Sequence, residues 1–177
     1  MAAAQPNWPL AIFEALRAAE VRQVAYVPDA GHSELIERCI AEPAMTAVPL
    51  TTEEEGVALL AGAWLGGERG VLLMQSSGVG NCVNMLSLTR TCRFPLLMLV
   101  TMRGQSGEFN PWQVPMGQIT GKVLELTGGL TFALEAGEAA GETVAEAARR
   151  AFEGPAAAAV LIAQRLVGVK SFTSESP

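Results

Sequence analysis

Residues 71–81 read Val-Leu-Leu-Met-Gln-Ser-Ser-Gly-Val-Gly-Asn, and their pattern is the strongest indication of the fold class. The run from Val71 to Gln75 is uninterrupted and apolar, as in a strand that helices cover on both faces. Ser76 to Gly80 is expected to be a glycine-containing turn, and a helix is expected to follow from about Asn81 to Thr91. A buried strand followed by a turn and a helix is the building unit of a parallel α/β sheet.

The same alternation of strand and helix extends to both sides of this stretch. Apolar residues at helical spacing predict helices over 8–20, 33–40, 116–126 and 139–152, and another that begins at Thr51–Glu55 and ends at Gly66–Gly67. Short apolar runs predict strands over 21–27, 45–50, 96–101, 131–134 and 157–163. Repeated strand–helix units predict an α/β fold of three layers, α/β/α, around a mostly parallel six-stranded sheet. We expect one domain over residues 1–170 and a flexible tail over 171–177.

The composition excludes several classes of protein. Of the 177 residues, 50% are hydrophobic and 17% are charged, which is too apolar for a disordered chain. No apolar run approaches the ~20 residues of a transmembrane helix, and residues 1–9 lack the pattern of a secretory signal. The net charge of −6, without a basic tract, argues against nucleic-acid binding.

Three cysteines, Cys39, Cys82 and Cys92, follow no metal-ligand spacing. We therefore expect no metal ligands on this chain, and buried free thiols in a reducing cytoplasm. The low charge and high apolar content of so small a chain also suggest that some apolar surface faces a partner subunit.

Ligands of parallel α/β sheets gather beyond the carboxyl ends of the strands. Four loops are expected there, over residues 28–32, 51–55, 75–81 and 103–115. The free amides of loop 75–81 could cradle an anion, although the loop lacks the Gly-Lys-Ser/Thr ending of a nucleotide P-loop and the full dinucleotide fingerprint. A tight turn that binds no ligand explains the same residues equally well.

Titratable residues in these loops are candidates for chemistry. Glu53, Glu54 and Glu55 are consecutive and point in different directions around a helix, so at most two of them can face a cleft. All three could also lie in solvent at the helix start. His32, the only histidine, could serve as an acid or base or could be structural. Arg103 could bind an anionic substrate group or lie on the surface.

Two longer segments resemble a known family. Glu53-Glu-Glu-Gly-Val-Ala-Leu-Leu-Ala-Gly-Ala-Trp-Leu-Gly-Gly67 and Val71-Leu-Leu-Met-Gln-Ser-Ser-Gly-Val-Gly-Asn-Cys-Val-Asn-Met-Leu86 are similar to the pyrimidine-binding domain of sulfopyruvate and phosphonopyruvate decarboxylases, which use thiamine diphosphate. The resemblance covers most of residues 8–165 and is extended by Val27-Pro-Asp29, Arg103-Gly104 and Pro115-Met-Gly-Gln118.

The resemblance implies roles for individual residues. In that family one glutamate hydrogen-bonds N1′ of the cofactor's aminopyrimidine ring and usually lies nine residues before the glycine of an Ala-Gly or Asp-Gly pair in the same helix. Counting back from Gly62 points to Glu53, while Glu54 and Glu55 stay open. The other implied residues are Gln75, Ser77, Gly78, Gly80 and Asn81 for the cofactor, Asp29 and His32 for proton transfer, and Arg103 and Gln118 for the substrate. Residues 105–113, with Phe109 and Trp112, form either a substrate cover or an ordinary interface loop.

One family motif is missing from these 177 residues. The diphosphate half of the family carries Gly-Asp-Gly, which holds Mg²⁺ and the diphosphate, and no Gly-Asp-Gly occurs here. The chain is also about half as long as a complete family member. The resemblance therefore implies a hetero-oligomer in which a β subunit carries that motif.

A split into two short subunits resembles sulfopyruvate decarboxylase, which forms sulfoacetaldehyde and CO2. Decarboxylation of phosphonopyruvate or another 2-keto acid is an alternative. A non-catalytic regulatory module of the same fold and a small-anion-binding protein are two further alternatives.

Overall fold

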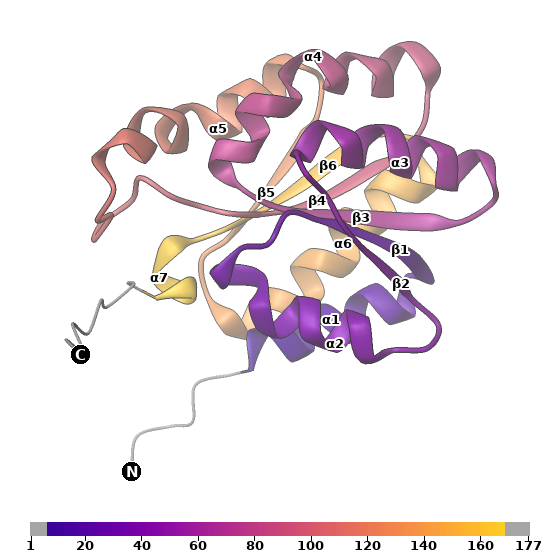
Figure 1. Cartoon of the computed structure of the whole chain (residues 1–177), viewed down its shortest axis with the longest axis horizontal. Coiled ribbons are helices and arrows are strands. Elements are labelled where there is room, and N and C mark those ends of the chain that lie inside the picture. The colour runs from indigo at the N-terminus through magenta and orange to yellow at the C-terminus, as the bar shows by residue number, and fades with distance from the viewer. Residues whose placement is uncertain (1–6, 169–177) are drawn as a thin grey trace.

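A six-stranded sheet forms the middle layer of the structure, a computed structural model that describes residues 7–168 (Figure 1). The strands are β1 (Val21–Tyr26), β2 (Thr46–Pro49), β3 (Arg69–Gln75), β4 (Leu96–Thr101), β5 (Leu130–Leu134) and β6 (Ala157–Ile162). Their order is β2-β1-β3-β4-β6-β5, and every neighbouring pair is parallel. The predicted α/β class, with six strands in one parallel sheet, is confirmed.

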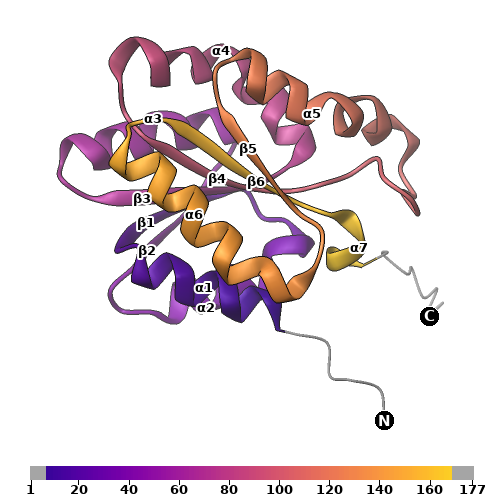
Figure 2. The same cartoon turned by 180° about the vertical axis from the view of Figure 1, so that it is seen from behind.

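Helices cover both faces of the sheet, as the two opposite views show (Figures 1 and 2). One face carries α1 (Trp8–Ala18), α2 (Ser33–Ala41) and α6 (Ala140–Glu153). The other carries α3 (Glu53–Leu65), α4 (Ser76–Cys92) and α5 (Val114–Leu126). The connections contain three 3₁₀ turns, η1 (Ala30–His32), η2 (Pro111–Gln113) and η3 (Gly137–Ala139), and the short helix α7 (Gln164–Val167).

The apolar run in β3 supplies both halves of the core. Val71 and Leu73 pack in the cluster under α1, α2 and α6, whereas Leu72 and Met74 pack in the cluster under α3, α4 and α5. Successive side chains of a strand point to opposite faces, so a strand between two helical layers needs apolar residues at every position. This explains why the run is continuous rather than alternating.

The start of α4 differs from the sequence-based expectation. The turn expected over Ser76–Gly80 is wrong, because the helix begins at Ser76, directly after the extended Gln75, and continues through both glycines. Glycine costs about 1 kcal/mol in a helix relative to alanine, so packing against neighbouring elements must offset this preference. The helix thus begins five residues earlier than expected, and this added segment lies at the carboxyl edge of the sheet.

The elements after β4 also differ from the sequence-based expectation. α5 begins at Val114 rather than Met116, with Pro115 in its first turn, where its missing N–H costs no helical hydrogen bond. The helix α7 was not predicted. The flexible tail predicted for residues 171–177 lies outside the described residues.

α5 packs very closely on the chain that leaves β4. Gly117, in the second turn of α5, is buried, and a Cβ at this position would overlap the backbone carbonyl of Arg103. Gly121, one turn further along, has only an ordinary contact, 3.5 Å from its ideal Cβ to Leu161 Cδ1. The absent side chain of Gly117 therefore sets the distance between α5 and the loop after β4.

We predict that Gly117→Ala lowers the free energy of unfolding by about 2 kcal/mol or more, because backbone on both sides must move. Gly121→Ala is the matched control, and it should leave stability unchanged or raise it by up to about 1 kcal/mol through better helix propensity. Urea unfolding of the two variants measures the difference. Equal stabilities would show that the close approach of α5 is not required.

His32 ties the loop after β1 to the centre of the sheet. Its side chain is fully buried, with Nε2 lying 3.2 Å from the carbonyl oxygen of Met74 in β3 and 3.1 Å from that of Leu99 in β4. Because both neighbours are acceptors, Nε2 carries the proton and donates. Nδ1 is buried without a hydrogen-bond partner within residues 7–168. Burial lowers the pKa of His32, opposed by the charge of Asp29 and by the two carbonyls, so the neutral ring is favoured.

Stability should therefore fall on mild acidification. The unfolded chain takes up a proton on His32 near the ordinary histidine pKa of about 6.5, while the folded chain resists protonation. The contribution of His32 to the free energy of unfolding is therefore complete above a pH of about 6.5 and declines below it. The decline approaches about 1.4 kcal/mol per pH unit until the folded pKa is reached. Denaturant unfolding between pH 8 and pH 5 measures it, with His32→Asn as the variant that should lose the slope. A wild-type stability that is flat in this range would contradict a neutral, buried His32.

Candidate functional site

The loops that follow the first four strands meet at one edge of the sheet, because all strands are parallel. Asp29 follows β1, Glu53 follows β2, Ser76 follows β3 and Arg103 follows β4. The chain order reverses at β1, whose neighbours β2 and β3 lie on opposite sides of it. Such a reversal point leaves a crevice beyond the carboxyl ends of the strands.

The three consecutive glutamates at the start of α3 have different surroundings. Glu53 is the first residue of the helix and only 7% exposed. Glu54 is exposed. Glu55 is also exposed and forms a capping box with Thr52, while its Oε2 accepts a hydrogen bond from the Thr51 N–H at 2.9 Å. Only Glu53 among the three therefore turns into the protein.

Glu53 lies against the first turns of α4. Its Oε2 accepts a hydrogen bond from Asn81 Nδ2 at 2.8 Å, and Oε1 has no hydrogen-bond partner within the described part of the chain. Gly78 lies one turn before Asn81 on the same face of α4, and a Cβ there would sit 2.5 Å from Glu53 Oε1. The carboxylate can occupy this place only because residue 78 is glycine.

The thiol of Cys82 belongs to the same region of α4. Burial raises the pKa of Cys82 to about 12, and the negative charges of Glu53 and Glu54 act in the same direction. The thiol is thus a neutral part of the wall beside Glu53. Cys39 and Cys82 are buried as expected, whereas Cys92 is exposed, contrary to the expectation of buried thiols.

The remaining predicted cofactor residues occupy the start of α4. Gln75 Oε1 accepts a hydrogen bond from Gln113 Nε2 at 3.1 Å, Ser77 is half-buried and Gly80 is exposed. Only the first amides of a helix lack a partner within it, so the amide of Gly78 is still in the free group, while those of Gly80 and Asn81 lie inside the helix ladder. Of the loop amides over 75–81 that could cradle an anion, those of Gly80 and Asn81 are therefore not free.

Asp29 and His32 lie in the neighbouring loop. Asp29 Oδ2 accepts hydrogen bonds from Thr101 Oγ1 at 2.8 Å and from the Gly31 N–H at 3.2 Å. Asp29 also lines a cavity of about 90 Å³, and Arg103, Phe109 and Asn110 are among its other lining residues. His32 is fully buried behind this loop. The roles of both residues in proton transfer stay predictions.

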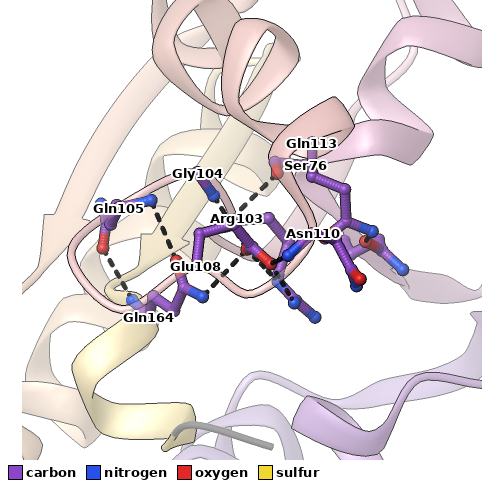
Figure 3. Close-up of polar contacts among 9 residues, drawn as sticks. Ser76, Arg103, Gly104, Gln105, Glu108, Asn110, Gln113 and Gln164 are labelled. Atoms are coloured by element: carbon purple, nitrogen blue, oxygen red, sulfur yellow. Dashed lines mark hydrogen bonds and ion pairs between the residues drawn. The ribbon is translucent and has the colours of Figure 1, made fainter.

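Arg103 is already paired within the chain (Figure 3). Its Nε and Nη2 donate to the two oxygens of Glu108 at 2.8 and 2.7 Å, and the Glu108 side chain is only 2% exposed. The Arg103 guanidinium holds the pKa of Glu108 well below its usual range, and this hydrogen-bonded pair in turn raises the pKa of Arg103. The predicted substrate-binding cation thus has its charge balanced by a partner that sequence reasoning missed.

Glu108 is the centre of a wider network in this loop (Figure 3). Its carboxylate also accepts hydrogen bonds from the N–H groups of Gly104 and Asn110 and from Gln164 Nε2. Gln164 belongs to α7 and exchanges two further bonds with Gln105. The five-residue spacing between Arg103 and Glu108 in the sequence does not predict this role. The network fixes the loop from Arg103 to Asn110 against the end of β6.

Other predicted features lie outside these contacts. Gln118 is exposed on α5, and no hydrogen bond of its side chain is seen within residues 7–168. In the same range no three His, Cys, Asp or Glu side chains come together as a metal site. No helix among those described has the length and apolar character to cross a membrane.

Comparison with known proteins agrees with this geometry. The family described as thiamine pyrophosphate enzyme, N-terminal TPP binding domain, matches residues 10–114, more than half of the chain. Sulfopyruvate decarboxylase subunit alpha of Methanothermobacter thermautotrophicus is 40% identical over 117 residues, which cover 66% of this chain and 71% of that one. The corresponding subunit of Methanocaldococcus jannaschii is 36% identical over 118 residues, covering 66% and 70%.

One further relative and one solved structure of the same fold are longer chains. Phosphonopyruvate decarboxylase of Streptomyces viridochromogenes is 44% identical over 108 residues, which cover 60% of this chain and 27% of that enzyme. The solved structure of 2-oxoglutarate:ferredoxin oxidoreductase from Magnetococcus marinus shares the fold, with a TM-score of 0.72 over 96% of this chain and 34% of that one, at 12% identity. The matched range contains Asp29, Glu53, Asn81 and Arg103. The chain belongs to the thiamine pyrophosphate enzyme family, as its N-terminal TPP-binding domain.

Proposed function

We propose that this chain is the α subunit of a thiamine-diphosphate-dependent decarboxylase that converts sulfopyruvate to sulfoacetaldehyde and CO2. The single observation that carries the proposal is the inward-turned carboxylate of Glu53, held against α4 at the carboxyl edge of the sheet. The names and the extent of the α-subunit relatives support the substrate.

The residues present fit the aminopyrimidine half of the cofactor. When bound, thiamine diphosphate supplies the electron sink for cleavage of the bond to the departing carboxylate. Glu53 keeps one oxygen, Oε1, without a partner in the described part of the chain, and Oε2 is held by Asn81. Oε1 can therefore hold a proton shared with N1′ of the ring, and the glycine at position 78 leaves room for the Glu53 side chain against α4.

Recognition of a doubly anionic substrate requires cations from elsewhere. Within residues 7–168 the arginines at the carboxyl edge are Arg103, paired with Glu108, and Arg165, paired with Glu135. Arg103 has only its remaining guanidinium N–H groups for a ligand, and Gln118 could add a neutral donor. We therefore propose that the partner subunit supplies most of the positive charge that the substrate contacts.

The same partner is proposed to hold Mg²⁺ and the diphosphate through Gly-Asp-Gly, giving a hetero-oligomer. The naming of the relatives as α subunits supports a second chain. Apolar side chains exposed on α4, η2 and α5 also support it, namely Val83, Trp112 and Ile119. Three free cysteines are consistent with a cytoplasmic location, which we include in the proposal.

Phosphonopyruvate is the second candidate substrate, because a phosphonopyruvate decarboxylase is 44% identical to the matched part of this chain. A non-catalytic regulatory module of the same fold would not need a carboxylate at position 53. The inward-turned side chain of Glu53 therefore disfavours this alternative. Nucleic-acid binding remains disfavoured by the net charge of −6.

We predict that Glu53→Gln in the assembled enzyme lowers kcat by at least about 100-fold and leaves assembly intact, since it removes the negative charge at N1′ and keeps the shape. Glu54→Gln is the matched control, because it makes the same change on the exposed neighbour, and it should retain near-normal kcat. Steady-state decarboxylation and size-exclusion chromatography measure the two properties. Near-normal turnover of Glu53→Gln would contradict the assignment.

We also predict that the isolated chain binds thiamine diphosphate negligibly and that affinity appears when the partner is added. Calorimetry with and without Mg²⁺ measures the affinity for the cofactor. In decarboxylation assays the paired subunits should turn over sulfopyruvate in preference to phosphonopyruvate and pyruvate. Tight Mg²⁺-dependent binding by this chain alone would refute the need for a partner. A preference for phosphonopyruvate would transfer the proposal to the second candidate.

A further inference from the structure

The amide of Asn81 contacts the carboxylate that the proposed function uses. Asn81 Nδ2 lies 2.8 Å from Glu53 Oε2, and the two residues come from different helices, 28 positions apart in the chain. Glu53 is buried, whereas Asn81 is an exposed residue of α4. The hydrogen bond therefore links a buried acceptor to a residue at the edge of the site.

We propose that Asn81 is a positioning residue, which acts on the reaction through Glu53 rather than by contacting the cofactor itself. This rests on the proposed function. The bond holds Oε2 in place and leaves Oε1 without a hydrogen-bond partner in the described part of the chain. It replaces the direct cofactor contact that the family resemblance implied for Asn81.

The physical reason is the freedom of a carboxylate. The terminal torsion of a glutamate is broad and roughly two-fold, so packing of the aliphatic part alone does not fix the plane of the oxygens. Gly78 allows the Cγ, Cδ and Oε1 atoms of Glu53 to lie against α4, and the Asn81 amide fixes the other oxygen. A hydrogen bond to an ionised acceptor is about twice as strong as a neutral one, which suits it to this task.

The same helix offers a matched control. Asn84 is also an exposed asparagine of α4, three positions beyond Asn81, and the structure shows no bond from its side chain to Glu53. Substitution of either asparagine by alanine removes one side-chain amide from neighbouring positions on the same helix. A difference between the two variants therefore reports on the contact with Glu53 and not on helix propensity.

The first experiment uses the chain without cofactor. The side-chain amide signals of Asn81 in a ¹⁵N–¹H NMR spectrum should shift on Glu53→Gln, while those of Asn84 stay in place. If the Asn81 signals do not move, the hydrogen bond is absent in solution and the inference is overturned, whatever the function.

The second experiment uses the assembled enzyme. Asn81→Ala should lower kcat roughly 10- to 100-fold with little change in the KM for substrate or in cofactor affinity, because a misplaced carboxylate affects the chemical step. Asn84→Ala should match the wild type. In the double variant Glu53→Gln/Asn81→Ala, kcat should be no lower than in Glu53→Gln alone, since Asn81 acts through Glu53.

The remaining outcomes separate the two proposals. Loss of cofactor affinity with unchanged kcat in Asn81→Ala would show a direct contact and overturn the positioning role. If the fold-losses in kcat of the two single variants multiply in the double variant, the positioning role is overturned as well. Asn81→Asp provides a second variant if alanine destabilises the chain. A wild-type enzyme without decarboxylase activity would overturn the proposed function, and this inference with it.

Discussion

The burial of one carboxylate between two helices is the constraint on which the rest of the site depends. Glu53 starts α3 and lies against the first turns of α4, a contact that is possible only because position 78 has no side chain. A buried carboxylate without hydrogen bonds is costly, and Asn81 provides one. In the proposed function the other oxygen, Oε1, contacts the aminopyrimidine ring of the cofactor.

The surrounding structure holds this contact in place. The parallel sheet brings the loops after β1, β2, β3 and β4 to the same edge, and its two-sided apolar core anchors α3 and α4. On the neighbouring side, Glu108 gathers the loop after β4 around Arg103, and Gly117 lets α5 approach that loop. The site is therefore built on rigid elements, which favours a fixed geometry over an adaptable one.

Much of the fold could be predicted from local pattern. The continuous run in β3 and the helical spacing of apolar residues indicated a covered parallel sheet, since period and burial are direct consequences of strand and helix geometry. The start of α4 was predicted wrongly, because the propensity of Gly78 and Gly80 suggested a turn whereas packing with α3 and α5 favours a helix. Propensity is a weak prior that tertiary contacts override.

The site was only partly predictable for the same reason. The family resemblance pointed to Glu53 through its distance from Gly62 and left Glu54 and Glu55 open. The burial of Glu53 and the exposure of the other two depend on where α4 lies, which the sequence does not report. The pairing of Arg103 with Glu108 and the burial of His32 between the carbonyls of Met74 and Leu99 depend on contacts within a folded loop and across the sheet, and no sequence spacing reports them.

The most direct test is a crystal structure of this chain assembled with its partner, Mg²⁺ and thiamine diphosphate. We expect Glu53 Oε1 to lie within about 2.7–3.2 Å of N1′ of the aminopyrimidine ring, with Oε2 still bonded to Asn81. A ring whose N1′ faces solvent or another residue, with Glu53 contacting only α4, would contradict the account.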